Sequence, residues 1–250
     1  MAVTIKSERE IELMREAGKR LAHVHQELEA MIAPGISTWE IDAKGEKLIR
    51  DCGCIPNFLH YNGYPASICV SVNDEVVHGI PRKDRYLKEG DIVSLDAGLI
   101  YKGYHSDAAR THAVGKVSTE AQKLMDVTKQ SFFEGIKMAK EGQHLHDISR
   151  AIEEYVTPYG YGIVRDLVGH GIGTALHEDP QIPNYAQKRR GVRLQAGMTL
   201  AIEPMINAGT WQVRFLRDGW TVVTKDGSLS AHYENTILVT DGEPEILTLY

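Results

Sequence analysis

The sequence predicts an α+β fold built from two similar halves, because two patterns each occur twice along the chain. First, the order helix, helix, strand, hairpin is indicated once before about residue 115 and once after it. Second, a short motif that ends in an acidic residue recurs in both halves, which indicates an internal duplication. No linker rich in Pro, Gly or Ser separates the halves. We therefore expect a single domain over 1–250, with halves at about 1–115 and 116–250.

The repeated motif places one acid in each half. A Leu-Lys-Glu-Gly segment at 87–90 leads to Asp96, and a Leu-Gln-Ala-Gly segment at 194–197 leads to Glu203, with the same spacing from the glycine. A His-Gly-Ile sequence precedes each acid, at His78 and at His170. Equivalent acids of two such halves are expected to face one another across the junction between the halves, where binding sites commonly form.

Helix signals begin the first half. A capping-box pattern at Ser7 and Glu10, followed by apolar residues at helical spacing, predicts a helix that ends before Pro34. The same pattern at Ser37 and Glu40 predicts a second helix to about residue 51. A strand is expected at 67–72. Segments 91–101 and 104–114 are rich in β-forming residues and predict a hairpin around Lys102-Gly103.

The second half repeats this order. Apolar spacing predicts a helix near 119–140 and a shorter helix near 146–157, before Pro158. A strand follows near 162–168, and β-hairpins are expected from 198 to 240.

Composition limits the class of protein. The 250 residues are 42% hydrophobic and 25% charged, as in globular domains, and the net charge of −6 argues against direct reading of nucleic acid. Cys52, Cys54 and Cys69 are odd in number and lack the C-x-x-C spacing. No signal-peptide core and no apolar stretch of membrane-spanning length is evident. We expect a reduced, cytoplasmic protein that does not contact membranes.

Acidic residues occur in segments that otherwise resemble buried strands. Asp96 and Glu203 lie in such runs, Asp107 is on the partner strand of the first hairpin, and Glu234 is the corresponding second acid of the later half. The spacing of Asp96 and Asp107 is compatible with positions directly across the hairpin. An unpaired ionised carboxylate would be very costly to bury there.

A pair of divalent cations would neutralise these carboxylates, which would otherwise raise one another's pKa. Four carboxylates and the imidazole of His170 suit Mn, Fe, Co or Zn in a two-metal site, whereas a structural zinc site would favour thiolates. A single strand Asp is more often a bulge or edge residue than a ligand. Four acids in matching positions favour the metal site.

The sequence resembles the methionine aminopeptidases of the bacterial type I kind, in the pita-bread metallopeptidase family, over nearly the whole chain. The resemblance implies a pita-bread fold, with antiparallel sheet inside and helices outside. It rests on the segments Tyr64–Cys69, Asn73–Pro81, Gly169–Gly173, Thr199–Met205, Asp218–Thr221 and Ser228–Glu234.

The resemblance implies that the metal ligands are Asp96, Asp107, His170, Glu203 and Glu234, with Asp107 and Glu234 bridging two ions. It implies further roles for three residues. Glu203 handles the proton of the attacking water, and His78 and His177 contact the substrate and the developing tetrahedral centre.

Four further residues match family positions that line the pocket for the methionine side chain: Tyr61, Tyr64, Cys69 and Trp220. A polarisable thioether suits such a lining. Phe58 stands where many bacterial members have Cys, and Leu176 stands where some have Phe. We assign no role to His112 or His232.

The function expected from the resemblance is removal of N-terminal methionine from nascent chains, near the ribosome and by a monomer, when the second residue is small. The spacing from His177 to Glu203 leaves no room for the helical insertion of type II members. Two alternatives remain open: a proline-specific peptidase of the same fold and a non-catalytic binding module. Loss of ligands would mark the binding module, and all five ligand positions are intact.

Overall fold

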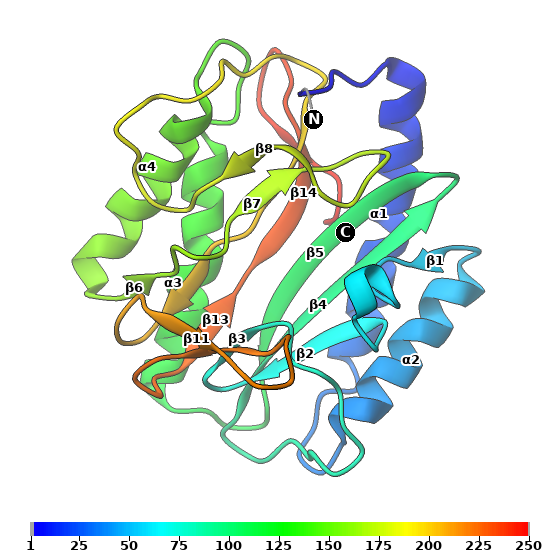
Figure 1. Ribbon diagram of the computed structural model, residues 1–250, viewed down its shortest axis with the longest axis vertical. Coiled ribbons are helices and arrows are strands. Elements are labelled where there is room, and N and C mark those ends of the chain that lie inside the picture. The colour runs from blue at the N-terminus through cyan, green and yellow to red at the C-terminus, as the bar shows by residue number, and fades with distance from the viewer. Residues whose placement is uncertain (1–2, 250) are drawn as a thin grey trace.

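A computed structural model describes residues 3–249 of the chain (Figure 1). No helix in this range combines the length and the apolar character needed to cross a bilayer. The helices are α1 (Glu8–Glu29), α2 (Thr38–Asp51), α3 (Thr119–Ile136) and α4 (Leu145–Val156), with short 3-10 helices η1 (Tyr61–Gly63) and η2 (Thr157–Tyr159).

The four predicted helices are confirmed, and capping explains where the first two begin. The backbone N–H of Ser7 donates to Glu10 Oε2 at 2.8 Å, and Ser37 makes the same bond to Glu40 Oε2 at 2.8 Å. Helix α3 ends at Ile136 instead of near residue 140. The difference arises because Lys140 pairs with Thr240 in a β-bridge, which requires extended backbone.

The strands form one large sheet and two small ones. In the large sheet the order is β1-β4-β5-β14-β9-β7-β8, with β2 paired to β4 and β15 to β14. Its strands are β1 (Ile55–Pro56), β2 (Ile68–Val72), β4 (Ile92–Tyr101), β5 (Tyr104–Ala113), β7 (Gly169–Gly171), β8 (Glu178–Ile182), β9 (Thr199–Ile202), β14 (Glu234–Leu238) and β15 (Glu245–Ile246). The small sheets hold β6 (Gly162–Ile163), β10 (Met205–Asn207) and β13 (Ser230–His232), and β3 (Glu75–Val77), β11 (Val213–Phe215) and β12 (Val222–Thr224).

The register of the β4–β5 hairpin corrects one prediction. Asp96 lies opposite Ala109 and Asp107 lies opposite Gly98, so the two acids are diagonal neighbours and not direct partners. A two-residue turn sets this register, because both of its residues, Lys102 (φ 49) and Gly103 (φ 86), are left-handed. The shift is two residues along the strand, and therefore both acids still project from the same face.

The second half is less regular than predicted. Strand β6 covers only 162–163 of the expected 162–168, because only these residues pair with β10. The region 198–240 is nested rather than a simple series of hairpins: β9 pairs with β14, β10 with β13, and β11 with β12. Strand β12 also pairs with β3 of the first half. Strands β1, β3, β7, β8 and β15 were not predicted.

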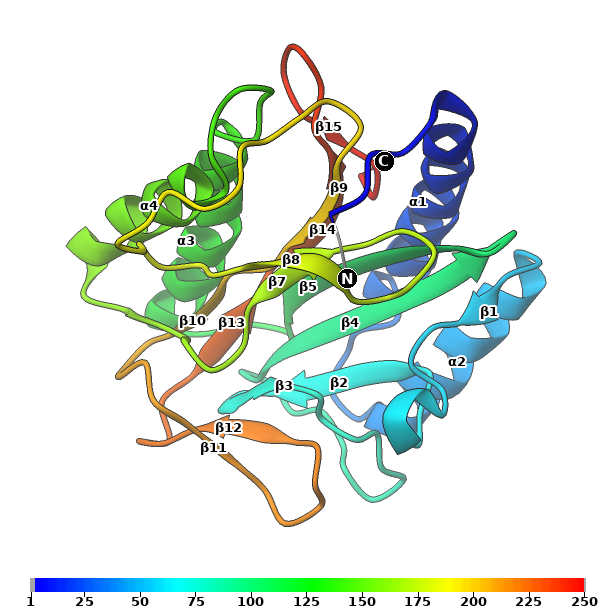
Figure 2. The ribbon, with the colours of Figure 1, turned by 45° about the horizontal axis from the view of Figure 1, so that its top comes forward.

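Helices cover the outer face of the large sheet, with α1 and α2 beside β2, β4 and β5, and α3 and α4 on the other side of the molecule (Figure 2). Alternation along β4 separates the two faces: Leu95 and Ala97 pack in a buried cluster with residues of α1 and α2. Leu200 and Ile202 of β9 pack in a second cluster with residues of α3 and α4. Asp96 directly follows Leu95, and Glu203 directly follows Ile202. Because successive side chains of a strand point to opposite faces, both acids point away from these buried clusters.

Candidate active site

Five neighbouring strands of the large sheet each bring one predicted ligand to the same face. In sheet order these are Asp96 on β4, Asp107 on β5, Glu234 at the start of β14, Glu203 directly after β9, and His170 on β7. Residues separated by more than a hundred positions in the sequence therefore become neighbours. The sheet, and not any local motif, assembles the set.

The strand registers arrange the donors in two rows. In the first row, Asp96 lies opposite Ala109, and Ala109 lies opposite Glu234. Glu203 continues this row because it extends β9 in its register with β14. The second row lies two residues along the strands and carries Asp107 and His170. This spacing keeps both rows on one face of the sheet.

The second row depends on a glycine and a threonine. Gly98 lies opposite Asp107, and a Cβ on Gly98 would be 3.1 Å from Asp107 Oδ1 and 2.6 Å from Asn57 Nδ2. Glycine therefore leaves the space that the Asp107 carboxylate occupies. The Thr236 hydroxyl accepts from the Asp107 N–H at 3.0 Å and donates to the Asp107 carbonyl at 2.9 Å, which fixes the backbone there.

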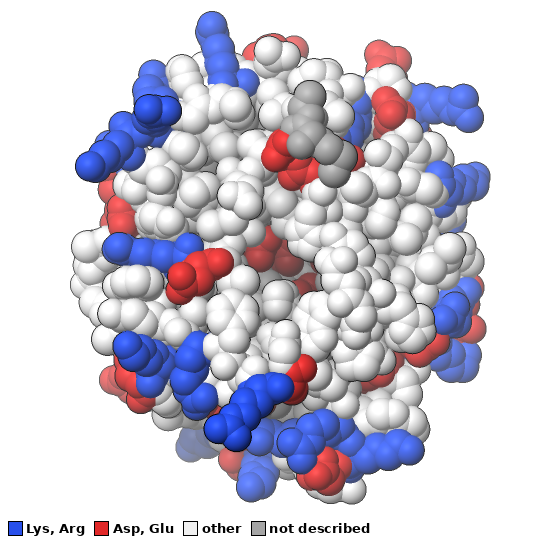
Figure 3. Space-filling model, in the orientation of Figure 1, with Lys and Arg blue, Asp and Glu red and all other residues white. Residues whose placement is uncertain are grey.

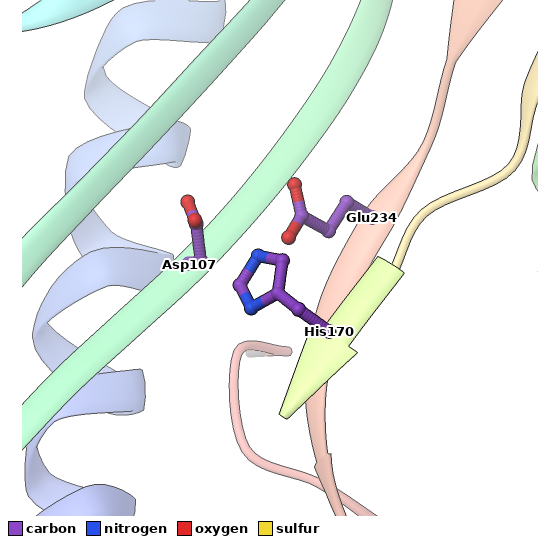
Figure 4. Close-up of side chains that lie close together, drawn as sticks. All are labelled: Asp107, His170 and Glu234. Carbon is purple, nitrogen blue, oxygen red and sulfur yellow. The ribbon is translucent and has the colours of Figure 1, made fainter. Parts of the chain in front are cut away.

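Asp107, His170 and Glu234 point toward one another (Figure 4), with donor atoms that all lie within 4.8 Å of each other. His170 Nε2 is 3.7 Å from Glu203 Oε1. The other ring nitrogen, Nδ1, is 2.8 Å from the Gly171 carbonyl, and its proton is donated to that oxygen. This hydrogen bond leaves the Nε2 lone pair free to face the carboxylates, the arrangement that orients a metal-binding histidine.

Burial dominates the electrostatics of the cluster. It raises the pKa of Asp96 to about 7, and it raises the pKa of Asp107, Glu203 and Glu234 well above the ordinary value, with neighbouring carboxylates adding to the effect. Burial, with His177 nearby, lowers the pKa of His170 to about 3. Without a cation the acids therefore resist ionisation, while the imidazole is neutral.

The residues present fit a divalent cation centre. Asp96 Oδ1, Asp107 Oδ1 and Glu234 Oε1 are buried and have no hydrogen-bond partner within residues 3–249. An unpaired buried charge costs several kcal/mol, which a cation would offset by binding to these oxygens. The donors are carboxylate oxygens and imidazole nitrogen, the set expected for borderline or hard divalent ions.

Metal is expected to stabilise the protein more as pH rises from about 4 to 7. The pKa of Asp96 is raised from 3.8 to about 7 in the folded protein, so between these values the unfolded chain holds fewer protons than the folded one. The stability of the metal-free protein therefore falls across this window. Cation binding needs the ionised form and becomes stronger across the same window.

The measurement is the change in Tm on adding Mn²⁺ at pH 5, 6, 7 and 7.5. The expected result is a gain that grows with pH and depends less on pH in Asp96→Asn. A gain that is equal at all four pH values would contradict the assignment of Asp96.

The cluster forms one end of a cavity of about 220 Å³. Figure 3 shows acidic atoms inside a hollow near the middle of this face, with uncharged residues around it and Lys and Arg mostly at the periphery. Every residue predicted for the site lines this cavity: Tyr61, Tyr64, Cys69, His78, Asp96, Asp107, His170, His177, Glu203, Trp220 and Glu234. Phe58, Asn62 and Leu176 complete the lining.

The other end of the cavity is apolar and aromatic. The Tyr64 and Trp220 rings meet edge to face, with centroids 5.1 Å apart. The Tyr64 hydroxyl donates to the Gly79 carbonyl at 2.9 Å, so its polar atom is satisfied and its ring faces the cavity lining. Burial raises the pKa of the Cys69 thiol well above its ordinary value. Cys69 is therefore a neutral lining group, unsuited to act as a thiolate nucleophile.

Two further histidines, His78 and His177, line the cavity together with the carboxylate cluster and the aromatic residues. His78 has φ 58, a left-handed conformation that costs a non-glycine residue about 1–3 kcal/mol, and its ring lies 6.3 Å from that of Trp220. His177 lies at the exposed rim, where its Nδ1 is 2.8 Å from the Tyr61 hydroxyl and its ring is 4.3 Å from that of His170. Burial lowers the pKa of His78 to about 4, so its imidazole is neutral.

Sequence reasoning missed Gly98, Thr236 and His232. Gly98 leaves room for the Asp107 carboxylate, and Thr236 hydrogen-bonds the Asp107 backbone. Only the strand register shows that these two residues lie beside Asp107. His232 ends β13, and its Nε2 is 3.8 Å from both Glu203 Oε2 and Glu234 Oε2. The available signal was its position two residues before Glu234, which suggests the same strand face.

A known family matches most of the chain. The family model described as metallopeptidase family M24 matches residues 12–241. The chain belongs to metallopeptidase family M24. Membership implies a hydrolase that uses a divalent metal, in agreement with the donor set described above.

Relatives and solved structures in this family match over the full length. The chain is 54% identical to methionine aminopeptidase of Clostridium acetobutylicum, covering 99% of each chain. It is 51% identical to methionine aminopeptidase 1 of Bacillus subtilis, covering 98% of this chain and 99% of the relative. The crystal structure of methionine aminopeptidase from Thermotoga maritima superposes with a TM-score of 0.97 at 46% identity, covering 100% of both chains. The predicted pita-bread fold is thereby confirmed.

Proposed function

We propose that this M24 enzyme removes the N-terminal methionine from nascent proteins and peptides when the second residue is small. The observation that carries the proposal is the single cavity that joins a carboxylate and imidazole cluster to an apolar, aromatic pocket. The relatives described above, named methionine aminopeptidases and 51–54% identical over nearly the whole chain, support the same activity.

We propose that Asp96, Asp107, His170, Glu203 and Glu234 hold two divalent ions, with Asp107 and Glu234 bridging them. The support is geometric: Asp107 and Glu234 occupy two adjacent interior strands of the cluster, between Asp96 on one side and Glu203 and His170 on the other. Co, Mn, Fe and Zn all suit these donors.

The cations, when bound, acidify water and stabilise negative charge that develops on a carbonyl oxygen. Side chains of the protein supply proton transfer and hydrogen bonds to the substrate. Glu203 takes up a proton at its carboxylate, a role supported by its position in the cavity lining among the proposed metal ligands. The neutral imidazoles of His78 and His177 flank the position of the scissile bond and donate hydrogen bonds to the oxygen as it gains charge.

The same cavity accounts for recognition of an N-terminal methionine in the substrate. Tyr61, Tyr64, Cys69 and Trp220 receive the methionine side chain, and a thioether packs favourably against aromatic rings. The free α-amine of the substrate binds at the opposite end, beside the residues that would hold the metal ions, which restricts the activity to chain ends.

The cavity size predicts a strict limit on the second residue. Its volume of about 220 Å³ is below the ~300–1,000 Å³ typical of ligand pockets, so little room remains beyond the scissile bond. Met-Ala-Ser is expected to release methionine rapidly, whereas Met-Lys-Ser and Met-Trp-Ser are expected to be poor substrates. Comparable rates for all three would refute the size limit.

An Ala-Pro peptide in the same assay tests the alternative activity. Preference for Ala-Pro over Met-Ala-Ser would indicate a proline-specific peptidase. No hydrolysis of any peptide by metal-loaded protein would indicate a non-catalytic binding module. The intact ligand set disfavours the second alternative, since all five donors line one cavity.

The proposal also covers the domain organisation of the enzyme and its location in the cell. We infer a single catalytic domain formed by internal duplication, because each half contributes ligands to one continuous sheet. A cytoplasmic monomer that acts on nascent chains near the ribosome would encounter the expected substrates, without contact with membranes and without reading nucleic acid. The three cysteines are free, as expected for a reducing compartment.

A further inference from the structure

A second imidazole lies beside the carboxylate cluster, and the predicted ligand set does not include it. His232 is only 1% exposed. Its Nε2 lies 3.8 Å from Glu203 Oε2 and 3.8 Å from Glu234 Oε2. Neither of its ring nitrogens has a hydrogen-bond partner in the described part of the chain. Burying a polar imidazole without a hydrogen-bond partner costs free energy, so a ligand for its nitrogen is expected.

Glu203 stands between two imidazoles. Its Oε1 is 3.7 Å from His170 Nε2, and its Oε2 is 3.8 Å from His232 Nε2. These separations are too long for hydrogen bonds. They suit two ligands of one cation, because donors that each lie about 2.0–2.2 Å from an ion are up to about 4.4 Å apart.

The donor atoms form two compact groups that share one residue. Asp107, His170 and Glu234 form the first, and Glu203, His232 and Glu234 form the second, each with donor atoms within 4.8 Å of one another. Each group therefore contains carboxylate oxygen and one imidazole nitrogen. Glu234 belongs to both, as expected for a residue that links two cation positions.

The backbone holds His232 in place. Its N–H donates to the Thr111 hydroxyl at 2.9 Å, and that hydroxyl lies 2.8 Å from the His232 carbonyl, to which it donates. On the other side, His232 pairs with Met205 of β10, one residue beyond Pro204 and two beyond Glu203. The ring is thus positioned by two neighbouring strands before any ion binds, which favours binding.

We propose that His232 Nε2 is a nitrogen ligand of the metal centre, on a cation held together with Glu203 and Glu234. The proposal rests on the proposed function in requiring a metal-dependent enzyme, and it extends the ligand set from one imidazole to two. An added nitrogen donor favours Co²⁺ and Zn²⁺ over the harder Mn²⁺. His232 therefore biases the choice of metal in this chain.

The test counts coordinated imidazoles by proton NMR of the Co²⁺-loaded protein in water and in D₂O. An imidazole bound through Nε2 retains an exchangeable proton on Nδ1, which paramagnetic Co²⁺ shifts far from the normal range. Two such resonances are expected in the parent protein and one in His232→Gln. His112→Gln replaces another largely buried histidine, outside the cavity, and is expected to retain both.

One shifted exchangeable resonance in the parent protein would overturn the proposal, as would two that persist in His232→Gln. The parent spectrum is decisive even if the variant does not fold. Calorimetry supplies a second measurement: His232→Gln is expected to lose at least about tenfold in Co²⁺ affinity and less in Mn²⁺ affinity. Because neither readout involves turnover, methionine release with only one resonance would remove this proposal and leave the proposed function intact.

Discussion

Replacing Asp96 with Asn is expected to abolish methionine release while weakening chiefly one of two metal-binding events. The substitution preserves shape but removes the charge of a buried carboxylate whose Oδ1 has no hydrogen-bond partner in the described residues. Asp96 lies on β4, at the edge of the cluster away from His170 on β7. Its loss should therefore affect the cation position on its own side and spare the one near His170.

Turnover of Met-Ala-Ser and calorimetric titration with Co²⁺ measure the two effects together. Asp126→Asn is the matched control, since it makes the same chemical change on an exposed residue of α3 and should leave both quantities unchanged. If Asp96→Asn behaves like the parent protein in turnover and in metal stoichiometry, the dinuclear assignment is wrong.

Alanine substitutions are expected to divide the three cavity histidines into two groups. His170 Nε2 faces Glu203, so His170→Ala should lose metal affinity directly, because carboxylates alone cannot replace its nitrogen. The His78 ring lies 6.3 Å from the Trp220 ring, and His177 Nδ1 lies 2.8 Å from the Tyr61 hydroxyl. Loss of His78 or His177 should leave metal in place and lower turnover by about 10²–10³-fold, as for removal of one donor to a developing oxyanion.

Each variant is titrated with Co²⁺, and turnover is then measured at saturating metal. His23→Ala, on the exposed side of α1, serves as the control for loss of an imidazole and should retain full activity. Normal turnover of His78→Ala and His177→Ala at saturating metal would show that they do not contact the reacting groups.

The helices and the hairpin were predictable because their signals are local. Capping boxes at Ser7 and Ser37 lie next to the helices they begin, and a two-residue turn joins β4 to β5. The exact register was not predicted, because it depends on the left-handed conformations of Lys102 and Gly103. A two-residue shift leaves side chains on the same face, so this error did not disturb the expected grouping of acids.

Features that depend on distant pairing were harder to predict. Strand β12 pairs with β3 across the two halves, and β9 with β14 around a nested hairpin. Neither pairing has a local sequence signal. The nearness of His232 to Glu203 likewise follows from a distant pairing, that of β13 with β10. Only its nearness to Glu234, two residues further along the chain, had a local signal.

The most direct test of the account is methionine release from Met-Ala-Ser by protein that has been exhaustively chelated and then reloaded with Co²⁺ or Mn²⁺. Metal content is determined in the same samples. We expect release to fall to background in the chelated protein and to return on reloading, with full activity reached by two equivalents of metal or fewer. Full activity in protein shown to be free of metal would contradict the central claim that this cavity hydrolyses peptides by means of bound cations.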